Sequence, residues 1–198
     1  MDNNIKNYID GLKVSDIPWG RMVTAYGTAL HYPEYISQME NAADKDTFMR
    51  AFSGIADLEH QDTMFPPAPF ALVFLVRIYE KLLAENTALA DEKAAELTRA
   101  FENYMFSVQY AEQYEHDEPV EYFSDMLSEE YLLDERFACT EPDDEELDEL
   151  FGDEELLTDP LFYSIYHYSG EVLSQVPDLL EKYGKFTDRI SKMRDTLA

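Results

Sequence analysis

The sequence predicts an all-α fold built of antiparallel helical hairpins, and three observations support this. Apolar residues recur at intervals of three and four along most of the chain, which is the spacing of one helix face. Glycine is scarce, with seven residues in 198, and only Asp10-Gly11 has the form of a tight hairpin turn. Hydrophobic residues make up 45% of the chain, enough for a sizeable core. We therefore expect a single helical domain over residues 1–198.

The first strong helical pattern runs from about residue 46 to residue 60. Its apolar positions are spaced by four, three and three, which places them on one helix face: Phe48, Phe52, Ile55 and Leu58. Asp46 or Thr47 is suited to cap its beginning, because side-chain oxygens of these residues accept hydrogen bonds from first-turn amides.

His60 is expected at the C-terminus of that helix. A histidine there can bond to the last unpaired carbonyls and interacts favourably with the helix dipole. Gln61 and Thr63 are expected to bond neighbouring backbone in the same turn. These residues then form a structural corner before the proline-rich stretch 66–69, rather than a catalytic site.

Two further helices are expected at about 70–83 and 90–112. Every residue from 70 to 76 is apolar, so this segment should be buried on all sides. The preceding prolines suit a first turn, since amides there lack intrahelical acceptors. The second helix carries one apolar stripe opposite its charged residues, formed by Ala94, Leu97, Phe101, Met105 and Val108.

Helices are also expected after residue 160. One apolar stripe consists of Leu161, Ile165, Tyr168, Val172 and Val176. Pro177 should end or kink this helix, and Asp178 would then lie in the first turn of the next, where a carboxylate suits the dipole. Gly184 marks another break, before a last pattern of Phe186, Ile190, Met193 and Leu197.

Residues 112–159 form a highly acidic segment. They hold 21 acidic residues and one basic residue, Arg136, so they contribute −20 of the formal net charge of −27. The apolar pattern from Tyr122 to Phe137 predicts an amphipathic helix. Leu147, Leu150 and Phe151 predict a short acidic helix, and we expect the chain to be partly mobile around 139–160.

The charge excludes some classes of partner. A net charge of −27 repels nucleic acid phosphates and anionic lipids, whereas it attracts basic proteins. The apolar run 68–76 is well short of the roughly 20 residues that span a bilayer. The polar N-terminus lacks the apolar core of a signal peptide, and Cys139 is the single cysteine. We therefore expect a cytoplasmic protein without nucleic acid or membrane ligands.

The sequence carries little sign of catalysis. Its four histidines are far apart, and it has no HExxH motif, glycine-rich phosphate loop or GxSxG elbow. The acidic stretch after Thr140 lacks the alternating ligands and glycine of a calcium-binding EF-hand loop. We expect no metal, no cofactor and no enzymatic activity. A histidine-based activity would most simply use His60.

Aromatic residues allow two interpretations. Tyr163, Tyr166, His167 and Tyr168 are clustered, and such residues serve either as core or as anchors of a protein interface. Both interpretations remain open at this point. Trp19 is expected to pack on the first helix.

Two stretches carry a family resemblance: PWGRMVTAYGTA (18–29) and LEHQDTMFPPAPFALVFLV (58–76). Together they resemble bacterial HEAT-like α-helical proteins found beside polymorphic toxins, several of which are regarded as immunity proteins. Trp19 and Tyr26 match the first part of the family pattern, and His60, Gln61 and Thr63 match the second. Asp62 stands where the pattern has glycine.

The resemblance covers about residues 18–83 and concerns the scaffold rather than a catalytic site. It implies helix pairs stacked as a short HEAT-like array. Periodicity alone is equally compatible with an irregular bundle.

Charge and resemblance together suggest a function. We expect an immunity or inhibitor protein that neutralises a basic bacterial toxin, for example a nuclease, by charge-complementary binding. The expected steering residues are Asp143, Asp144, Glu145, Glu146, Asp148 and Glu149. The alternative is a HEAT-like adaptor or scaffold that binds other cellular proteins. The sequence favours no particular oligomeric state.

Overall fold

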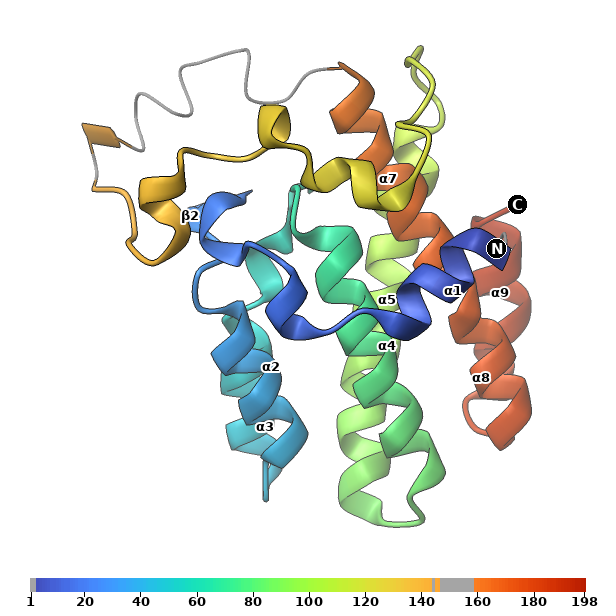
Figure 1. Ribbon diagram of the computed structural model, residues 1–198. Coiled ribbons are helices and arrows are strands. Elements are labelled where there is room, and N and C mark those ends of the chain that lie inside the picture. The colour runs from blue at the N-terminus through green and yellow to red at the C-terminus, as the bar shows by residue number, and fades with distance from the viewer. Residues whose placement is uncertain (1–2, 144, 147–158) are drawn as a thin grey trace.

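The computed structural model describes residues 3–143, 145–146 and 159–198, and these form an all-α fold, as predicted (Figure 1). The α-helices are α1 (Asn3–Gly11), α2 (Tyr32–Asn41), α3 (Lys45–Ser53), α4 (Ala68–Ala84), α5 (Ala88–Ala111), α7 (Asp159–Leu173), α8 (Gln175–Tyr183) and α9 (Ile190–Thr196). Two small antiparallel hairpins join them: β1 (Val23–Thr24) with β2 (Gly27–Thr28), and β3 (Glu59–His60) with β4 (Thr63–Met64).

Helix α4 lies at the centre of the fold. Residues 70–76 are all buried, as their unbroken apolar run predicted. Pro67 caps the helix and Pro69 lies in its first turn, where a missing amide proton is tolerated. A single connected cluster of buried hydrophobic side chains extends from Ile9 to Met193. None of the described helices is long and apolar enough to cross a membrane.

The contacts of α4 bear on the two predicted arrangements. It packs against α2, α5, α7 and α8, and therefore against helices from both ends of the chain. In a solenoid each repeat contacts mainly its neighbours. The packing thus corresponds to an irregular bundle around α4 and does not confirm a HEAT-like array.

Helix α3 is shorter than predicted. It ends at Ser53 rather than near residue 60, and its cap is Asp44, whose side chain accepts a hydrogen bond from the Thr47 amide at 2.7 Å. Ile55 and Leu58 are nevertheless buried. The chain continues as the 3₁₀ turn η3 (Ala56–Leu58), whose three residues per turn preserve the spacing that had suggested one long helix.

The later helices largely follow the sequence pattern. All five stripe residues of α5 are buried, and Thr87 caps the helix. The break expected at Pro177 instead falls at Ser174, because a proline is tolerated in the first turn of α8. Asp178 lies in that turn, and Gly184 ends α8 with a left-handed φ of 65°.

Residues 118–143, which we call the acidic strap, cross one end of the molecule from α5 toward β2 (Figure 1, yellow to orange). The prediction of one amphipathic helix from Tyr122 to Phe137 is wrong. The strap forms three separate 3₁₀ turns instead, η4 (Phe123–Leu127), η5 (Glu129–Tyr131) and η6 (Glu135–Ala138).

Local side-chain bonds explain the interrupted strap. The amide of Tyr122 donates to the Asp125 carboxylate at 3.2 Å, and the amide of Arg136 donates to the Asp134 carboxylate at 2.9 Å. Such bonds compete with helical ones, and repulsion between neighbouring carboxylates disfavours a continuous helix. The acidic helix predicted around Leu147 lies outside the described residues, as does most of the stretch expected to be mobile.

The segment 19–28 anchors the strap. Arg21 donates from Nε to the carbonyl of Leu133 at 2.6 Å and pairs with Glu129 at 2.6 and 3.1 Å. The amide of Leu133 donates in return to the Arg21 carbonyl at 2.9 Å. Farther along, the Thr28 hydroxyl donates to the Glu141 carboxylate at 2.8 Å.

Trp19 belongs to the core beneath this anchor. Its indole N–H donates to the Val14 carbonyl at 2.7 Å. The ring packs against Tyr32 of α2 and Phe74 of α4, with centroids 5.7 and 6.1 Å away. Trp19 is therefore a core residue, and its aromatic contacts are with α2 and α4.

Gly20 provides a test of the anchor. A Cβ atom there would lie 2.4 Å from the carbonyl oxygen of Phe137 and 2.9 Å from that of Ala138. Gly20→Ala should therefore displace η6 and lower the free energy of unfolding by about 1–3 kcal/mol, measured by urea denaturation. Gly11→Ala, which meets no atom within 4 Å, is the control and should leave stability equal or slightly higher. Equal losses in both variants would contradict the close contact.

Candidate partner-binding site

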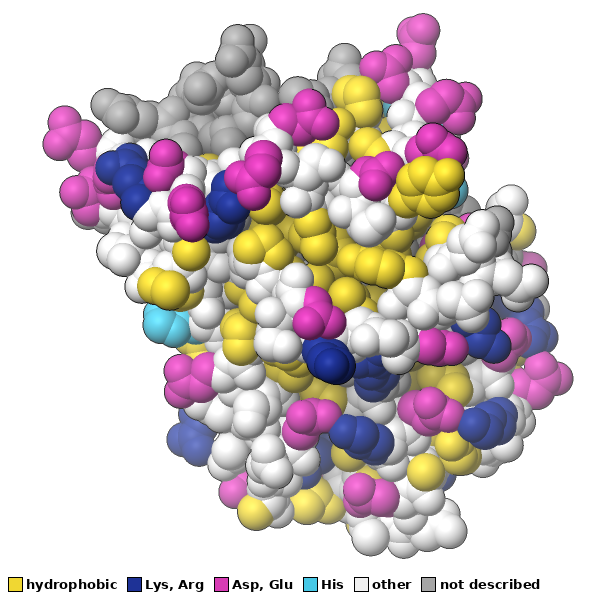
Figure 2. Space-filling view, in the orientation of Figure 1, with side chains coloured by type: hydrophobic (Ala, Val, Ile, Leu, Met, Phe, Trp, Pro, Cys, Tyr) yellow, Lys and Arg dark blue, Asp and Glu magenta, His cyan; other side chains and the backbone are white. Residues whose placement is uncertain are grey.

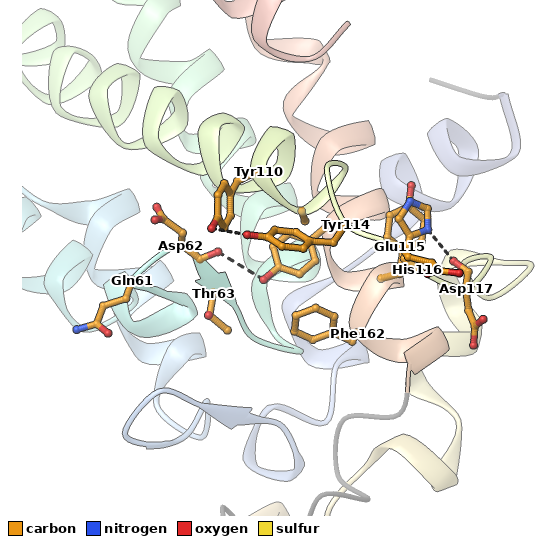
Figure 3. A pocket seen from close by; sticks show the side chains of 12 residues that line it. Gln61, Asp62, Thr63, Tyr110, Tyr114, Glu115, His116, Asp117 and Phe162 are labelled. Atoms are coloured by element: carbon orange, nitrogen blue, oxygen red, sulfur yellow. Dashed lines mark hydrogen bonds between the residues drawn. The ribbon is translucent and has the colours of Figure 1, made fainter.

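A pocket of about 530 Å³ opens between the end of α5, the start of α7 and the β3–β4 hairpin (Figure 3). These elements come from three separate parts of the sequence and meet at the end of the molecule that the strap crosses. The lining residues belong wholly to the described part of the chain. They include the hairpin loop residues Gln61 and Asp62, a group of aromatic side chains, and the acidic residues Glu115 and Asp117.

Aromatic rings form the walls of the pocket. Tyr110 lies in the last turn of α5 and Tyr114 just after the helix, with ring centroids 5.2 Å apart, and the Tyr114 hydroxyl donates a hydrogen bond to that of Tyr110. Phe162 packs edge-on against Tyr166, also at 5.2 Å. The exposed fractions of Tyr110, Tyr114 and Phe162 are 40%, 56% and 38%. Large aromatic side chains this exposed are typical of protein interfaces.

Three of the pocket phenols, Tyr114, Tyr163 and Tyr166, have a raised pKa. Burial raises the pKa of Tyr163, and so does the hydrogen bond from its hydroxyl to Glu112 at 2.7 Å. Burial likewise raises the pKa of Tyr166. The hydrogen bond with Tyr110 raises the pKa of Tyr114. These three phenols therefore stay uncharged near neutral pH, and the carboxylates of the lining are those of Asp62, Glu115 and Asp117.

His116 is held against one wall. Its ring stacks on Tyr163 with centroids 3.4 Å apart and planes 7° from parallel. Its Nδ1 lies 2.9 Å from the Asp117 carbonyl oxygen. In Figure 3, His116 and Asp117 lie at one end of the pocket, and Asp62 lies beside Tyr110 at the other.

The β3–β4 hairpin presents Asp62 to the pocket. Gln61 and Asp62 have φ values of 53° and 65°, and positive φ at both loop residues is what a type I′ turn requires. The Asp62 amide donates to Glu59 at 2.7 Å. The hairpin docks on α7, because the Met64 amide donates to the Tyr166 hydroxyl at 3.1 Å.

This hairpin corrects the role predicted for His60. His60 is a strand residue paired with Thr63, not the last residue of a helix, so it caps no helical carbonyls. Its ring instead meets Tyr26, whose hydroxyl lies 3.1 Å from Nδ1. The Ala25 amide donates to the Asp57 carbonyl at 3.3 Å and joins the two hairpin regions. The two stretches that carried the resemblance thus meet in space.

Half of the acidic residues expected to steer a partner lie within the described part of the chain. Asp143 and Glu146 each accept a hydrogen bond from the other's amide, at 2.9 and 3.1 Å. Glu146 also pairs with Arg136 at 2.8 Å, while Asp143 and Glu145 are exposed. The other three, Asp144, Asp148 and Glu149, lie outside the described residues.

The sequence patterns did not identify the pocket. Tyr110 falls off the apolar stripe of α5, and an aromatic residue on a polar helix face is the signal that could have drawn attention to it; Tyr114 lies beyond the end of the helix. The clustered tyrosines for which the sequence allowed either a core or an interface role are all buried: Tyr163, Tyr166 and Tyr168. The first two also line the pocket.

Comparisons with family models, curated proteins and solved structures found no match for this chain. Within the described residues, no group of three or more His, Cys, Asp and Glu side chains could hold a metal ion. The chemistry of the site therefore rests on its own geometry, which offers aromatic faces, uncharged hydroxyls and carboxylates.

Replacing Asp62 tests the hairpin. Left-handed backbone costs about 1–2 kcal/mol for a residue with a Cβ atom, whereas glycine adopts it freely. Asp62→Gly should therefore raise the free energy of unfolding by about 1 kcal/mol, measured by urea denaturation. Asp62→Asn should raise the free energy of unfolding by less, because asparagine tolerates this conformation only somewhat better than aspartate does. A loss of stability in Asp62→Gly would contradict the assigned turn.

Proposed function

We propose that this protein is a non-catalytic binding protein that captures a basic protein partner through the end of the molecule carrying the strap and the pocket. The observation that carries the proposal is the pocket itself, in which exposed aromatic rings lie between carboxylates. Aromatic residues contribute most to binding energy at the centre of an interface. Charges around it govern the association rate and the choice of partner.

The distribution of charge supports a basic partner. On the face shown in Figure 2, Asp and Glu side chains crowd the end formed by the strap, whereas both signs are mixed over the rest. Two cations are paired with acidic side chains here, Arg21 with Glu129 and Arg136 with Glu146. Residues 112–159 have a net charge of −20 and contain a single basic residue, Arg136. Most of their carboxylates therefore cannot pair with a cation from the same segment.

A narrower form of the proposal names the partner. We propose an immunity-type inhibitor that acts in the cytoplasm against a basic toxin such as a nuclease. The resemblance of residues 18–29 and 58–76 to toxin-associated proteins supports it. So does the charge, because a nuclease needs a cationic cleft to hold phosphates, and an acidic protein surface complements that cleft.

Co-expression tests this form of the proposal. The product of the gene directly upstream should arrest growth of a bacterial host, and the protein described here should restore growth and form a complex with it. An upstream product that is harmless, or that is toxic but not bound, would contradict the toxin assignment. A non-toxic upstream product that binds would indicate the adaptor function instead.

Neutralising the six steering residues tests the role of charge. Changing Asp143, Asp144 and Asp148 to Asn, and Glu145, Glu146 and Glu149 to Gln, should slow association with that partner about tenfold or more at about 50 mM salt. The loss should shrink at about 500 mM salt, where screening is strong. Stopped-flow fluorescence measures both rates.

A charge-matched control separates local from overall charge. It changes three Asp to Asn and three Glu to Gln on other exposed surfaces: Asp10, Asp46, Asp195, Glu34, Glu85 and Glu92. The control has the same net charge as the six-residue variant, yet it should associate at nearly the wild-type rate. Equal slowing in both variants would contradict a local steering surface.

A further inference from the structure

We infer that the pocket between α5, α7 and the β3–β4 hairpin is a recognition site for an arginine side chain of the basic partner. The inference rests on the proposed function, because it specifies which group of a basic protein the pocket receives. It draws on three features of the pocket: its aromatic walls, its carboxylates and its size.

The aromatic walls suit a guanidinium group. Tyr110, Tyr114 and Phe162 leave 38–56% of their surface exposed around an open pocket. Arginine stacks on aromatic faces through cation–π contact, which contributes about 0.5–2 kcal/mol. The hydroxyl groups of Tyr110 and Tyr114 lie beside these exposed rings and add polar atoms to the pocket wall.

The carboxylates are placed to receive a cation. Asp62 lies at one end of the pocket, and Glu115 and Asp117 lie at the other (Figure 3). Among the described residues, none of these three carboxylates forms an ion pair or accepts a hydrogen bond. Their lone pairs are therefore available to an incoming donor. A guanidinium presents five N–H groups in a plane. It can bond one carboxylate through two parallel N–H···O hydrogen bonds.

Size and charge narrow the choice of ligand. A volume of about 530 Å³ holds a long side chain together with part of the backbone that carries it. Phosphate-bearing ligands are disfavoured by the three carboxylates. Lysine is less suited than arginine, because its ammonium group is more strongly hydrated and cannot stack or bond a carboxylate in the paired planar geometry.

Three blocked tripeptides test the inference directly. They are Ac-Gly-Arg-Gly-NH2, the same peptide with lysine, and the same peptide with citrulline, which keeps the shape of arginine but is uncharged. The arginine peptide should shift backbone amide NMR signals of residues 61–63 and 110–117 saturably, with a Kd of about 1–10 mM. The lysine peptide should bind at least about threefold more weakly, and citrulline should cause no saturable shift.

Variants locate the binding. Tyr114→Leu and Asp62→Asn should each weaken the arginine peptide about fivefold or more, because they remove a stacking face and a carboxylate. Tyr114 is exposed and asparagine tolerates the Asp62 backbone, so both variants should fold. The matched control is Phe106→Leu, an aromatic residue of α5 that is 53% exposed and lies outside the pocket, and it should bind normally.

Several results would overturn the inference. They are no saturable shift up to roughly 50 mM arginine peptide, equal binding of the citrulline or lysine peptide, and unchanged binding in Tyr114→Leu. The proposed function fails separately. If the basic partner binds the protein while the peptide does not, the function stands and the arginine site is wrong. If the peptide binds while basic proteins do not, the arginine site stands and the proposed function is wrong.

Discussion

Burial of the apolar run 70–76 of α4 is the constraint on which the rest of the structure depends. A segment that is apolar on every side must be covered on every side, and α4 as a whole packs against α2, α5, α7 and α8. Phe70 stacks on Phe123 of the strap at 4.9 Å, and Phe123 stacks in turn on Tyr168 of α7 at 4.8 Å. The acidic strap is thereby fixed to the same core as the helices that frame the pocket.

The strap reconciles strong negative charge with a compact fold. Its carboxylates repel one another, yet Phe123, Met126, Leu133 and Phe137 are buried and hold it to the molecule. Arg21 adds a fixed attachment through Leu133 and Glu129. The carboxylates remain largely at the surface, so an acidic end attached to the core lies beside an aromatic pocket. That is the arrangement expected of a surface preorganised for a cationic partner.

Sequence patterns failed where side chains or distant contacts outweighed local spacing. The spacing around Ile55 and Leu58 resembled a helix because a 3₁₀ turn has nearly the same period. The β3–β4 hairpin was missed because neither Gln61 nor Asp62 is glycine, although both adopt positive φ. Contacts with Tyr166 hold this hairpin, and a residue 102 positions away cannot be read from local sequence.

The sequence by itself determined the all-α class, the burial of α4 and the course of α5, because these depend on the spacing of apolar residues along the chain. It also determined that negative charge is concentrated in residues 112–159. Only the tertiary structure decided where that charge lies and what lies next to it. Tyr114, Asp62 and Phe162 belong to three distant segments, and they form one pocket only because the packing of α5, α7 and the hairpin around α4 brings them together.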